Sequence, residues 1–359
     1  MTQDHIISRY FPAAKLEGLP DDLDEPHYAA MDTALRRAAV ARIDLATSIW
    51  RAADDDAGRI QAWRALDRDA YDAETLRAVD TVLKRQLEKP RNRLPTGEIE
   101  FALGELGLLD EANGVLTDEE KRKLDVDGYL DLGPLIPAAQ LEQMRRRYDD
   151  AIEAEADTAG HEVSQMHGIG RVSGTVVKPM NRDGLLDVVF MHQRLLAAVR
   201  HVLGPHFKYS STNYHCPLPR YGHQGIHADW GWGVSEPEVV NAIWMPDDVT
   251  EENGPTRVVP GTHRSGQHPH GRVTHGEPID PNAPVEGEVR ITGSAGSCMV
   301  YNAHLWHGGT QNRTNGLRRS QHAFFTRSHR APQTDAAALL DPQVLARLGR
   351  VERAVLDLP

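Results

Sequence analysis

Apolar residues in the first third of the chain recur every three or four positions. Two runs show this spacing, one from Leu35 to Trp50 and one from Leu76 to Leu87. The period places apolar side chains on one face of a helix. The segment Glu88–Pro95 contains two prolines and indicates a linker after the second run. Residues 1–112 are therefore predicted to be a helical region without candidate ligands, which packs on a core or builds a homodimer surface. A lid over the substrate is the alternative.

The pattern becomes mixed after residue 112. Thr117 and Glu120 have the spacing of a capping box, in which both side chains satisfy free N–H groups at a helix start. A strand is predicted over residues 127–133, and a helix follows it. The β-branched segment Val172–Lys178 predicts a further strand. Residues 185–203 predict a helix that ends before a Gly-Pro pair.

Between Phe207 and Phe325 the pattern changes to short apolar or β-branched runs separated by Gly, Pro and Asn. The predicted strands are Phe207–Cys216, Val239–Trp244, Thr256–Val259, Glu288–Thr292, Ser297–Asn302 and Ser320–Thr326. Many short strands with such breaks favour a sandwich or barrel, including the double-sheet jelly roll. One helix is predicted in the tail. The expected organisation is a helical region 1–112, a β-rich domain 113–330 and a helical tail 331–359.

Composition narrows the class of protein and of partner. The formal net charge of −12 argues against a general nucleic-acid surface. No run approaches the roughly 18 apolar residues that a membrane span needs. Cys216 and Cys298 are too few for a disulfide framework, and the first residues do not resemble a signal peptide. The expected setting is a reducing cytoplasm, and the expected partner is a small molecule.

The candidate chemistry lies in His227-Ala-Asp229. On an extended segment, residues two apart point to the same side, so both side chains can reach one metal ion. His307, in Asn302-Ala-His-Leu-Trp-His-Gly-Gly309, is the candidate third ligand. Two histidines and one carboxylate with open positions suit a non-haem Fe(II) oxygenase.

Each ligand has a competing interpretation. Asp229 could be a turn residue, and His304 competes with His307. Strand alternation is expected to place positions 304 and 307 on opposite faces, so only one of them would face the metal. We favour His307 because Gly308 follows it and Arg318 lies eleven residues further on.

Several motifs together resemble the phytanoyl-CoA dioxygenase family of Fe(II)/2-oxoglutarate oxygenases. The matching pieces are Asp127-Gly-Tyr129, His227-Ala-Asp229, Trp244, Asn253-Gly-Pro255, Val259–His263, His307-Gly308 and Arg318. The resemblance covers roughly residues 115–330. It implies a double-stranded β-helix, a jelly roll of the cupin-like kind, flanked by helices. It also implies Fe(II), 2-oxoglutarate and O2 as cofactor and co-substrates.

The resemblance also implies roles for individual residues. His227, Asp229 and His307 would hold the iron, and Arg318 would bind the distal carboxylate of 2-oxoglutarate. A guanidinium suits that role because it stays charged and makes two parallel bonds to a carboxylate. Arg319 is the rival anchor. Two further residues are expected to line the co-substrate pocket: Trp244 and Lys178.

The substrate is indicated only in outline. Tyr209, Ser211, Asn213 and His215 alternate along one predicted strand, and Arg220, His223, Trp230 and Trp232 flank the metal motif. Polar groups beside aromatic walls suit a small polar or ring-bearing metabolite.

The expected reaction is hydroxylation or a related oxidation, with release of succinate and CO2. Relatives that transfer halide lack the carboxylate found here at Asp229, so halogenation is not expected. The alternative is a non-redox metal-binding jelly roll, an isomerase or hydrolase. Arg318 and Asn253-Gly-Pro255 argue against it.

Overall fold

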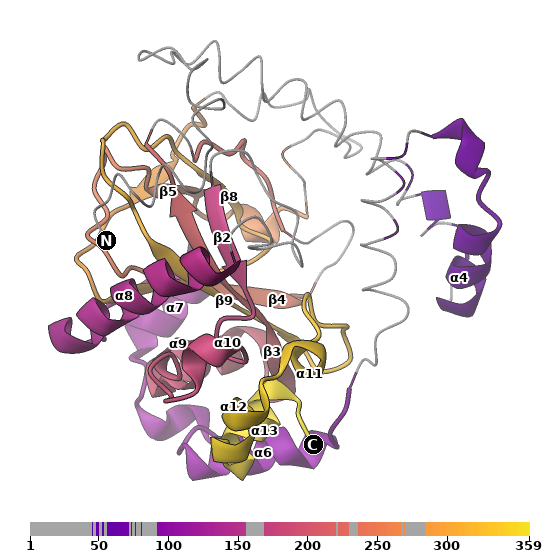
Figure 1. Cartoon of the computed structure of the whole chain (residues 1–359), viewed down its shortest axis with the longest axis horizontal. Coiled ribbons are helices and arrows are strands. Elements are labelled where there is room, and N and C mark those ends of the chain that lie inside the picture. The colour runs from indigo at the N-terminus through magenta and orange to yellow at the C-terminus, as the bar shows by residue number, and fades with distance from the viewer. Residues whose placement is uncertain are drawn as a thin grey trace.

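The computed structural model describes residues 92–155, 169–219, 222–229, 236–266 and 284–359, together with residue 269 and scattered residues between 45 and 80. Two antiparallel sheets form its centre (Figure 1). Sheet A has the order β1-β7-β4-β9-β3-β2, and sheet B has the order β6-β5-β8. The strands of sheet A are β1 (Tyr129–Pro134), β2 (Ile169–Ser173), β3 (Phe207–Pro217), β4 (Val239–Trp244), β7 (Ser297–Asn302) and β9 (Ser320–Arg327). Those of sheet B are β5 (Thr256–Val259), β6 (Val289–Ile291) and β8 (Trp306–Gly309).

An apolar cluster joins the two sheets. Ile243, Met299 and Tyr301 of sheet A pack in one buried group with Val258 and Ile291 of sheet B. This face of sheet A, turned toward sheet B, is called the inner face below. Two antiparallel sheets packed in this way, with helices on the outside, confirm the predicted jelly roll.

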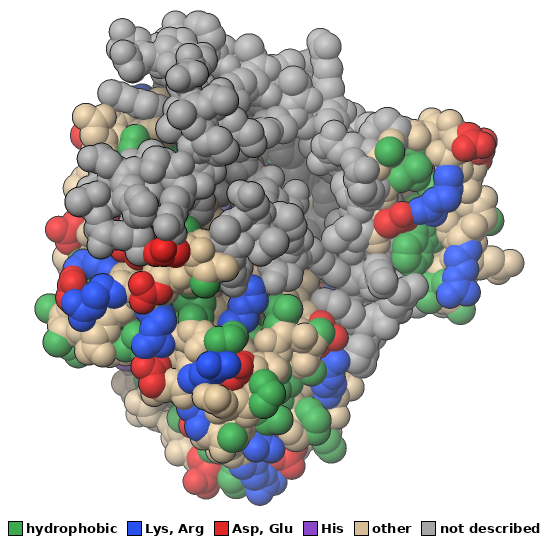
Figure 2. All heavy atoms as spheres, viewed as in Figure 1, with side chains coloured by type: hydrophobic (Ala, Val, Ile, Leu, Met, Phe, Trp, Pro, Cys, Tyr) green, Lys and Arg blue, Asp and Glu red, His purple; other side chains and the backbone are tan. Residues whose placement is uncertain are grey.

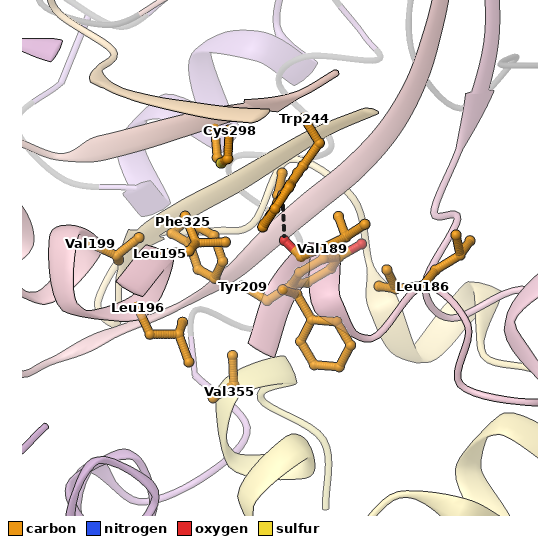
Figure 3. Close-up of a cluster of buried hydrophobic side chains, with 14 of the residues drawn as sticks. Leu186, Val189, Leu195, Leu196, Val199, Tyr209, Trp244, Cys298, Phe325 and Val355 are labelled. Atoms are coloured by element: carbon orange, nitrogen blue, oxygen red, sulfur yellow. Dashed lines mark hydrogen bonds between the residues drawn. The ribbon is translucent and has the colours of Figure 1, made fainter. Parts of the chain in front are cut away.

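Helices cover the other face of sheet A, which we call the helix face. They are α6 (Thr96–Glu105), α7 (Asp118–Val126), α8 (Ala138–Glu155), α9 (Val188–Met191), α10 (Gln193–Leu203), α11 (Ala336–Leu339), α12 (Pro342–Arg347) and α13 (Arg350–Leu356). Figure 3 shows Leu195 and Val199 of α10 near Phe325 of β9. Val355 of α13 belongs to the same buried cluster. Alternate residues of each strand enter this core because successive side chains point to opposite faces.

The predicted capping box at Thr117 and Glu120 is confirmed. Three other local predictions need adjustment. The strand predicted over Val172–Lys178 ends at Ser173, because Gly174 turns the chain with a φ of +67°. The helix predicted over 185–203 divides at His192, whose extended backbone caps α10. The single helix expected in the tail is three short ones.

The start of the main core lies before residue 113. Ile99, Ala102 and Leu103 of α6 belong to the same buried cluster as the helix face of sheet A. The predicted linker ends in contact with the tail, since the backbone N–H groups of Arg93 and Leu94 both donate to Asp357. A boundary at 112/113 therefore divides one core, and we propose a boundary near residue 92 instead.

The part of the chain before residue 81 is described only in pieces. Helix α4 (Asp56–Arg64) lies apart from the sheets in Figure 1, and Leu45 and Ile49 form a separate apolar cluster. Most of the predicted helix from Leu35 to Trp50 falls outside the described residues. Figure 2 shows basic and acidic side chains interspersed over the visible helices. None of the described helices is both long enough and apolar enough to cross a membrane.

Candidate metal centre

Three side chains converge where the two sheets meet. Nε2 of His227 lies 3.5 Å from Oδ1 of Asp229, and Nε2 of His307 lies 3.4 Å from Oδ2 of the same carboxylate. The two imidazole centroids are 4.3 Å apart. All three candidate ligand atoms lie within 4.8 Å of one another, so one metal ion could contact each of them.

Backbone pairing brings these residues together across 80 positions of sequence. His227 and His307 exchange two backbone hydrogen bonds, each 2.8 Å long, as an isolated antiparallel bridge. The N–H of Asp229 donates to the carbonyl of Ala303 at 3.0 Å. His307 lies on β8 directly opposite Val258, whose side chain belongs to the cluster between the sheets. The His307 side chain therefore faces the interior, on the same side as the inner face of sheet A.

Hydrogen bonds select the ring nitrogen that each histidine can offer. Nδ1 of His227 lies 2.8 Å from the carbonyl of Gly225, and Nδ1 of His307 lies 2.8 Å from that of Leu305. A carbonyl only accepts, so Nδ1 carries a proton in both rings, and Nε2 is the nitrogen that can offer a lone pair to a metal ion once it has lost its own proton. Both Nε2 atoms lie beside the Asp229 carboxylate. This donor set fits a divalent metal ion.

Asp229 is held as a carboxylate. Burial alone would raise the pKa of Asp229, but the charges and hydrogen bonds of His307 and His227 hold that pKa well below its usual value. The same pairing raises the pKa of His227 against the effect of its burial. The amide of Asn241 donates to Oδ2 of Asp229 at 2.5 Å and to the hydroxyl of Tyr301 at 3.2 Å. Asn241 thus orients the carboxylate.

His304 does not join this group. It lies in the turn between β7 and β8, so the assumption that one strand carries both histidines is wrong. His304 is buried, and burial lowers its pKa to about 4.

The neighbouring arginines differ in their partners. Arg318 is buried, donates to the carbonyl of Gly254 at 2.7 Å and to the hydroxyl of Ser320 at 3.1 Å, and keeps an unpartnered Nε within the described structure. Burial lowers the pKa of Arg318 to about 10, so it remains charged at neutral pH. Arg319 instead forms ion pairs with Asp149 and Asp247, each at 3.2 Å. Arg318 is therefore the guanidinium available for an added carboxylate.

Trp244 lies away from the metal group, contrary to expectation. Its indole N–H donates to the carbonyl of Val189 at 3.1 Å, within the apolar cluster of the helix face (Figure 3). Alternation along β4 explains this placement, because Asn241 on the inner face is three residues away. Lys178 precedes the 3-10 helix η5 (Pro179–Asn181), which packs on α8 and α12. The position of Trp244 argues against a contact with the co-substrate. The position of Lys178 beside η5 does not support such a contact.

A β-bulge changes the predicted alternation along β3. Tyr209 pairs with Phe325 and Ser211 pairs with Phe324, so Ser210 is an extra residue. Tyr209 consequently enters the helix-face core, and its hydroxyl contacts Thr212. Asn213 and His215 do lie on the inner face, because their neighbours Tyr214 and Cys216 belong to the opposite core. The expectation for Tyr209 was wrong, since sequence alternation assumes an unbroken ladder.

The remaining predicted substrate residues flank the metal motif. His223 lies in the segment that runs beside β8, where the N–H of Gln224 donates to the carbonyl of Gly309 at 2.9 Å. Arg220, Trp230 and Trp232 lie outside the described residues.

Some inner-face residues escaped the sequence analysis. His322 of β9 stacks on His215 with ring centroids 4.1 Å apart. Arg171 of β2 pairs across the strands with His215. The alternation of polar residues at 320 and 322 could have revealed His322. The sequence gives no such signal for Arg171, because the residue opposite it in the sheet, His215, lies 44 positions further along the chain.

Comparisons with known proteins find one matching family and several similar chains. The family model described as Phytanoyl-CoA dioxygenase (PhyH) matches residues 124–320, more than half of the chain. Dioxygenase FUM3 of Gibberella moniliformis is 26% identical over 245 residues, covering 63% of this chain and 74% of that protein. The peroxisomal phytanoyl-CoA dioxygenase of Homo sapiens is 23% identical over 235 residues, with coverages of 59% and 69%. The solved structure of EctD from S. alaskensis with 2-oxoglutarate and 5-hydroxyectoine has a TM-score of 0.49 at 19% identity, with coverages of 68% and 88%.

Proposed function

The chain belongs to the phytanoyl-CoA dioxygenase family, and from this premise we propose that it is an Fe(II)- and 2-oxoglutarate-dependent hydroxylase of a small polar or ring-bearing metabolite. One observation carries the proposal. Two Nε2 atoms and one carboxylate lie within 4.8 Å of one another, with both histidines fixed in the tautomer that a metal needs.

His227, Asp229 and His307 would hold the iron. Two imidazoles and one carboxylate leave coordination positions for a bidentate co-substrate and for O2. When bound, iron and 2-oxoglutarate supply the oxidation of an unactivated C–H bond, coupled to the conversion of 2-oxoglutarate into succinate and CO2. Nδ1–H of each histidine donates to a backbone carbonyl, and this hydrogen bond fixes the orientation of the ring.

Arg318 would bind the distal carboxylate of 2-oxoglutarate. A buried guanidinium can make charge-assisted bonds to a carboxylate that are stronger than neutral hydrogen bonds. Arg319 is engaged by two aspartates and is not available for this role.

The substrate would meet the inner face of sheet A and the segment around the metal motif. Asn213 and His215 supply hydrogen-bonding groups there, and His223, Arg220, Trp230 and Trp232 are proposed as further contacts. Hydroxylation is favoured over halogenation because Asp229 would take the place beside a bound metal that a halide would need. Its negative charge also disfavours a second anion beside it.

Anaerobic titration tests the proposal. Addition of Fe(II) and then 2-oxoglutarate should produce a weak visible charge-transfer band, and exposure to O2 should release succinate. The Arg318→Gln variant should need much more 2-oxoglutarate for the same band. Protein that binds Zn(II) but gives neither band nor succinate would support the non-redox alternative.

A further inference from the structure

Four buried or partly buried polar side chains form a continuous patch on the inner face of sheet A. Arg171 stands opposite His215, and Ser173 stands opposite Asn213, in the antiparallel pairing of β2 with β3. Directly paired residues point to the same face. The intervening Val172, Tyr214 and Cys216 face the opposite core. We call Arg171, Ser173, Asn213 and His215 the β2–β3 patch.

The patch is close to the metal group and distinct from Arg318. Asn213 lies directly opposite His322 of β9, and β9 pairs in turn with β4, whose Asn241 donates to Asp229. Burial opposes the charged form of Arg171, and the Asp229 carboxylate favours it. Arg318 is instead bonded to Gly254 and Ser320. Two buried guanidiniums thus serve different parts of the inner face. A bound metal ion would offset the charge of Asp229, and the positive charge of Arg171 would then attract a second anion to this part of the inner face.

Three other members of the patch have polar atoms without a hydrogen-bond partner in the described structure. They are Oγ of Ser173, Oδ1 of Asn213 and Nε2 of His215. Buried polar groups are normally satisfied, so three adjacent exceptions indicate a missing ligand.

The amide of Asn213 is oriented by its surroundings. Its Nδ2 donates at 3.5 Å to both Ser211 Oγ and Gln333 Oε1, and the Ser211 hydroxyl itself donates to Gln333 Oε1. If the amide of Asn213 were reversed, Oδ1 of Asn213 would lie against the side-chain oxygen Oε1 of Gln333, and neither atom could donate a hydrogen bond. Oδ1 of Asn213 is therefore left as an acceptor, which calls for an N–H or O–H donor on the ligand.

We propose that the β2–β3 patch recognises the substrate, and that this substrate is a small carboxylic acid with an O–H or N–H donor, the carboxylate binding Arg171 and the donor binding Asn213. This inference rests on the proposed function, since it assigns the remaining polar groups of the same site. Ser173 and His215 complete the hydrogen bonding around the two anchors.

The test uses the full chain loaded with Co(II) and 2-oxoglutarate, which does not require turnover. Propionate is the minimal carboxylate probe, and propionamide is its neutral control. Proton line broadening by Co(II) reports a probe that binds near the metal. Wild type should broaden propionate saturably and leave propionamide sharp. Arg171→Gln should weaken propionate binding by about tenfold or more, the effect of losing a charge-assisted hydrogen bond.

Three controls separate the possible sources of the signal. Arg171→Lys keeps the charge and should retain part of the binding, which guards against simple misfolding of the Gln variant. Arg290→Gln, an exposed residue of β6, should behave as wild type. Broadening that persists in Arg171→Gln would mean direct coordination of propionate to Co(II), and this would overturn the proposal. A loss of 2-oxoglutarate affinity in Arg171→Gln, comparable to that in Arg318→Gln, would assign Arg171 to the co-substrate and also overturn it.

A second probe tests Asn213. Wild type should bind 3-hydroxypropionate more tightly than propionate, because the hydroxyl can donate to Oδ1. Asn213→Ala should remove this difference. Equal affinity of wild type for the two probes would refute the donor requirement. Failure of wild type to bind 2-oxoglutarate would instead refute the proposed function, so the two failures are distinguishable.

Discussion

The two faces of sheet A differ in chemistry although the same strands build them. On β9, Ala323 and Phe325 enter the helix-face core, while Ser320 and His322 lie on the inner face. On β4, Trp244 enters the core and Asn241 contacts Asp229. Each strand thus contributes alternately to packing and to chemistry.

The helix face of sheet A contributes mainly to stability, and the inner face contributes mainly to binding. Apolar side chains on the helix face are removed from water and stabilise the fold. Unpartnered polar atoms on the inner face oppose folding, each by about 1–3 kcal/mol when fully buried. Such groups are retained where a ligand satisfies them. Substitutions on the helix face should therefore affect unfolding, and substitutions on the inner face should affect binding.

The largest expected effect is at the metal group. His227→Ala, Asp229→Ala and His307→Ala should each weaken Fe(II) binding by more than the roughly 10–100-fold that loss of a supporting residue causes. His304→Ala should keep most of the binding. Metal titration by calorimetry measures this, together with succinate release. An inactive His304→Ala beside an active His307→Ala would show that the third ligand is misassigned.

Arg318 and Arg319 are adjacent in the sequence but are expected to have different roles, one in binding 2-oxoglutarate and one in stabilising the fold. Arg318→Gln removes one side of a desolvated charge pair, which costs about 3–5 kcal/mol, so the Michaelis constant for 2-oxoglutarate should rise by roughly 100-fold or more. Arg319→Gln should instead lower the free energy of unfolding, because Asp149 and Asp247 both lose their ion pair with Arg319, and among the described residues only Asp247 keeps another one, with Arg145. Steady-state kinetics and urea unfolding of both variants distinguish the roles. Unchanged 2-oxoglutarate kinetics in Arg318→Gln would rule out the anchor.

Phe325 and Phe324 test the two faces directly, since they are neighbours on β9. Phe325 is fully buried in the helix-face core, and its replacement by Ala should cost about 3–5 kcal/mol of stability. Phe324 is only partly buried on the inner face, beside His322, and Phe324→Ala should cost less. Urea unfolding of the metal-free protein measures both. Equal losses would contradict the division between the faces.

The sequence allowed much of this architecture to be predicted, because strand alternation is a local signal. Val239–Trp244 and Ser297–Asn302 were assigned with their observed bounds. What failed depended on contacts between distant segments. The bulge at Ser210 is visible only in the pairing of β3 with β9. Trp244 matched a family motif, but the face that it occupies follows from the register of its strand.

Asn241 is expected to have a smaller effect than the ligands. Its amide orients Asp229, so Asn241→Ala should reduce Fe(II) affinity by about 10–100-fold. Asn241→Asp should also weaken binding or shift the affinity for metal with pH, because it sets a second carboxylate beside the first. Thr326→Ser, at another inner-face position of sheet A, provides a conservative control. Wild-type metal affinity in Asn241→Ala would show that Asp229 needs no such support.

The smallest effect concerns acid stability and the neutral histidines of the inner face. Burial, together with the charges of Arg318 and Arg171, lowers the pKa of His322 to about 3. The unfolded chain, with a histidine pKa of about 6.5, binds more protons between these values than the folded chain does. Stability is therefore fully present above pH 6.5 and declines as the pH falls toward 3, by at most about 1.4 kcal/mol per pH unit. His322→Asn should reduce the stability lost between pH 7.5 and pH 5.5, measured by urea unfolding of the metal-free protein. His206→Gln, at a half-exposed position outside the sheets, should leave that loss unchanged. A His322→Asn variant that loses as much stability as wild type would place the acid sensitivity elsewhere.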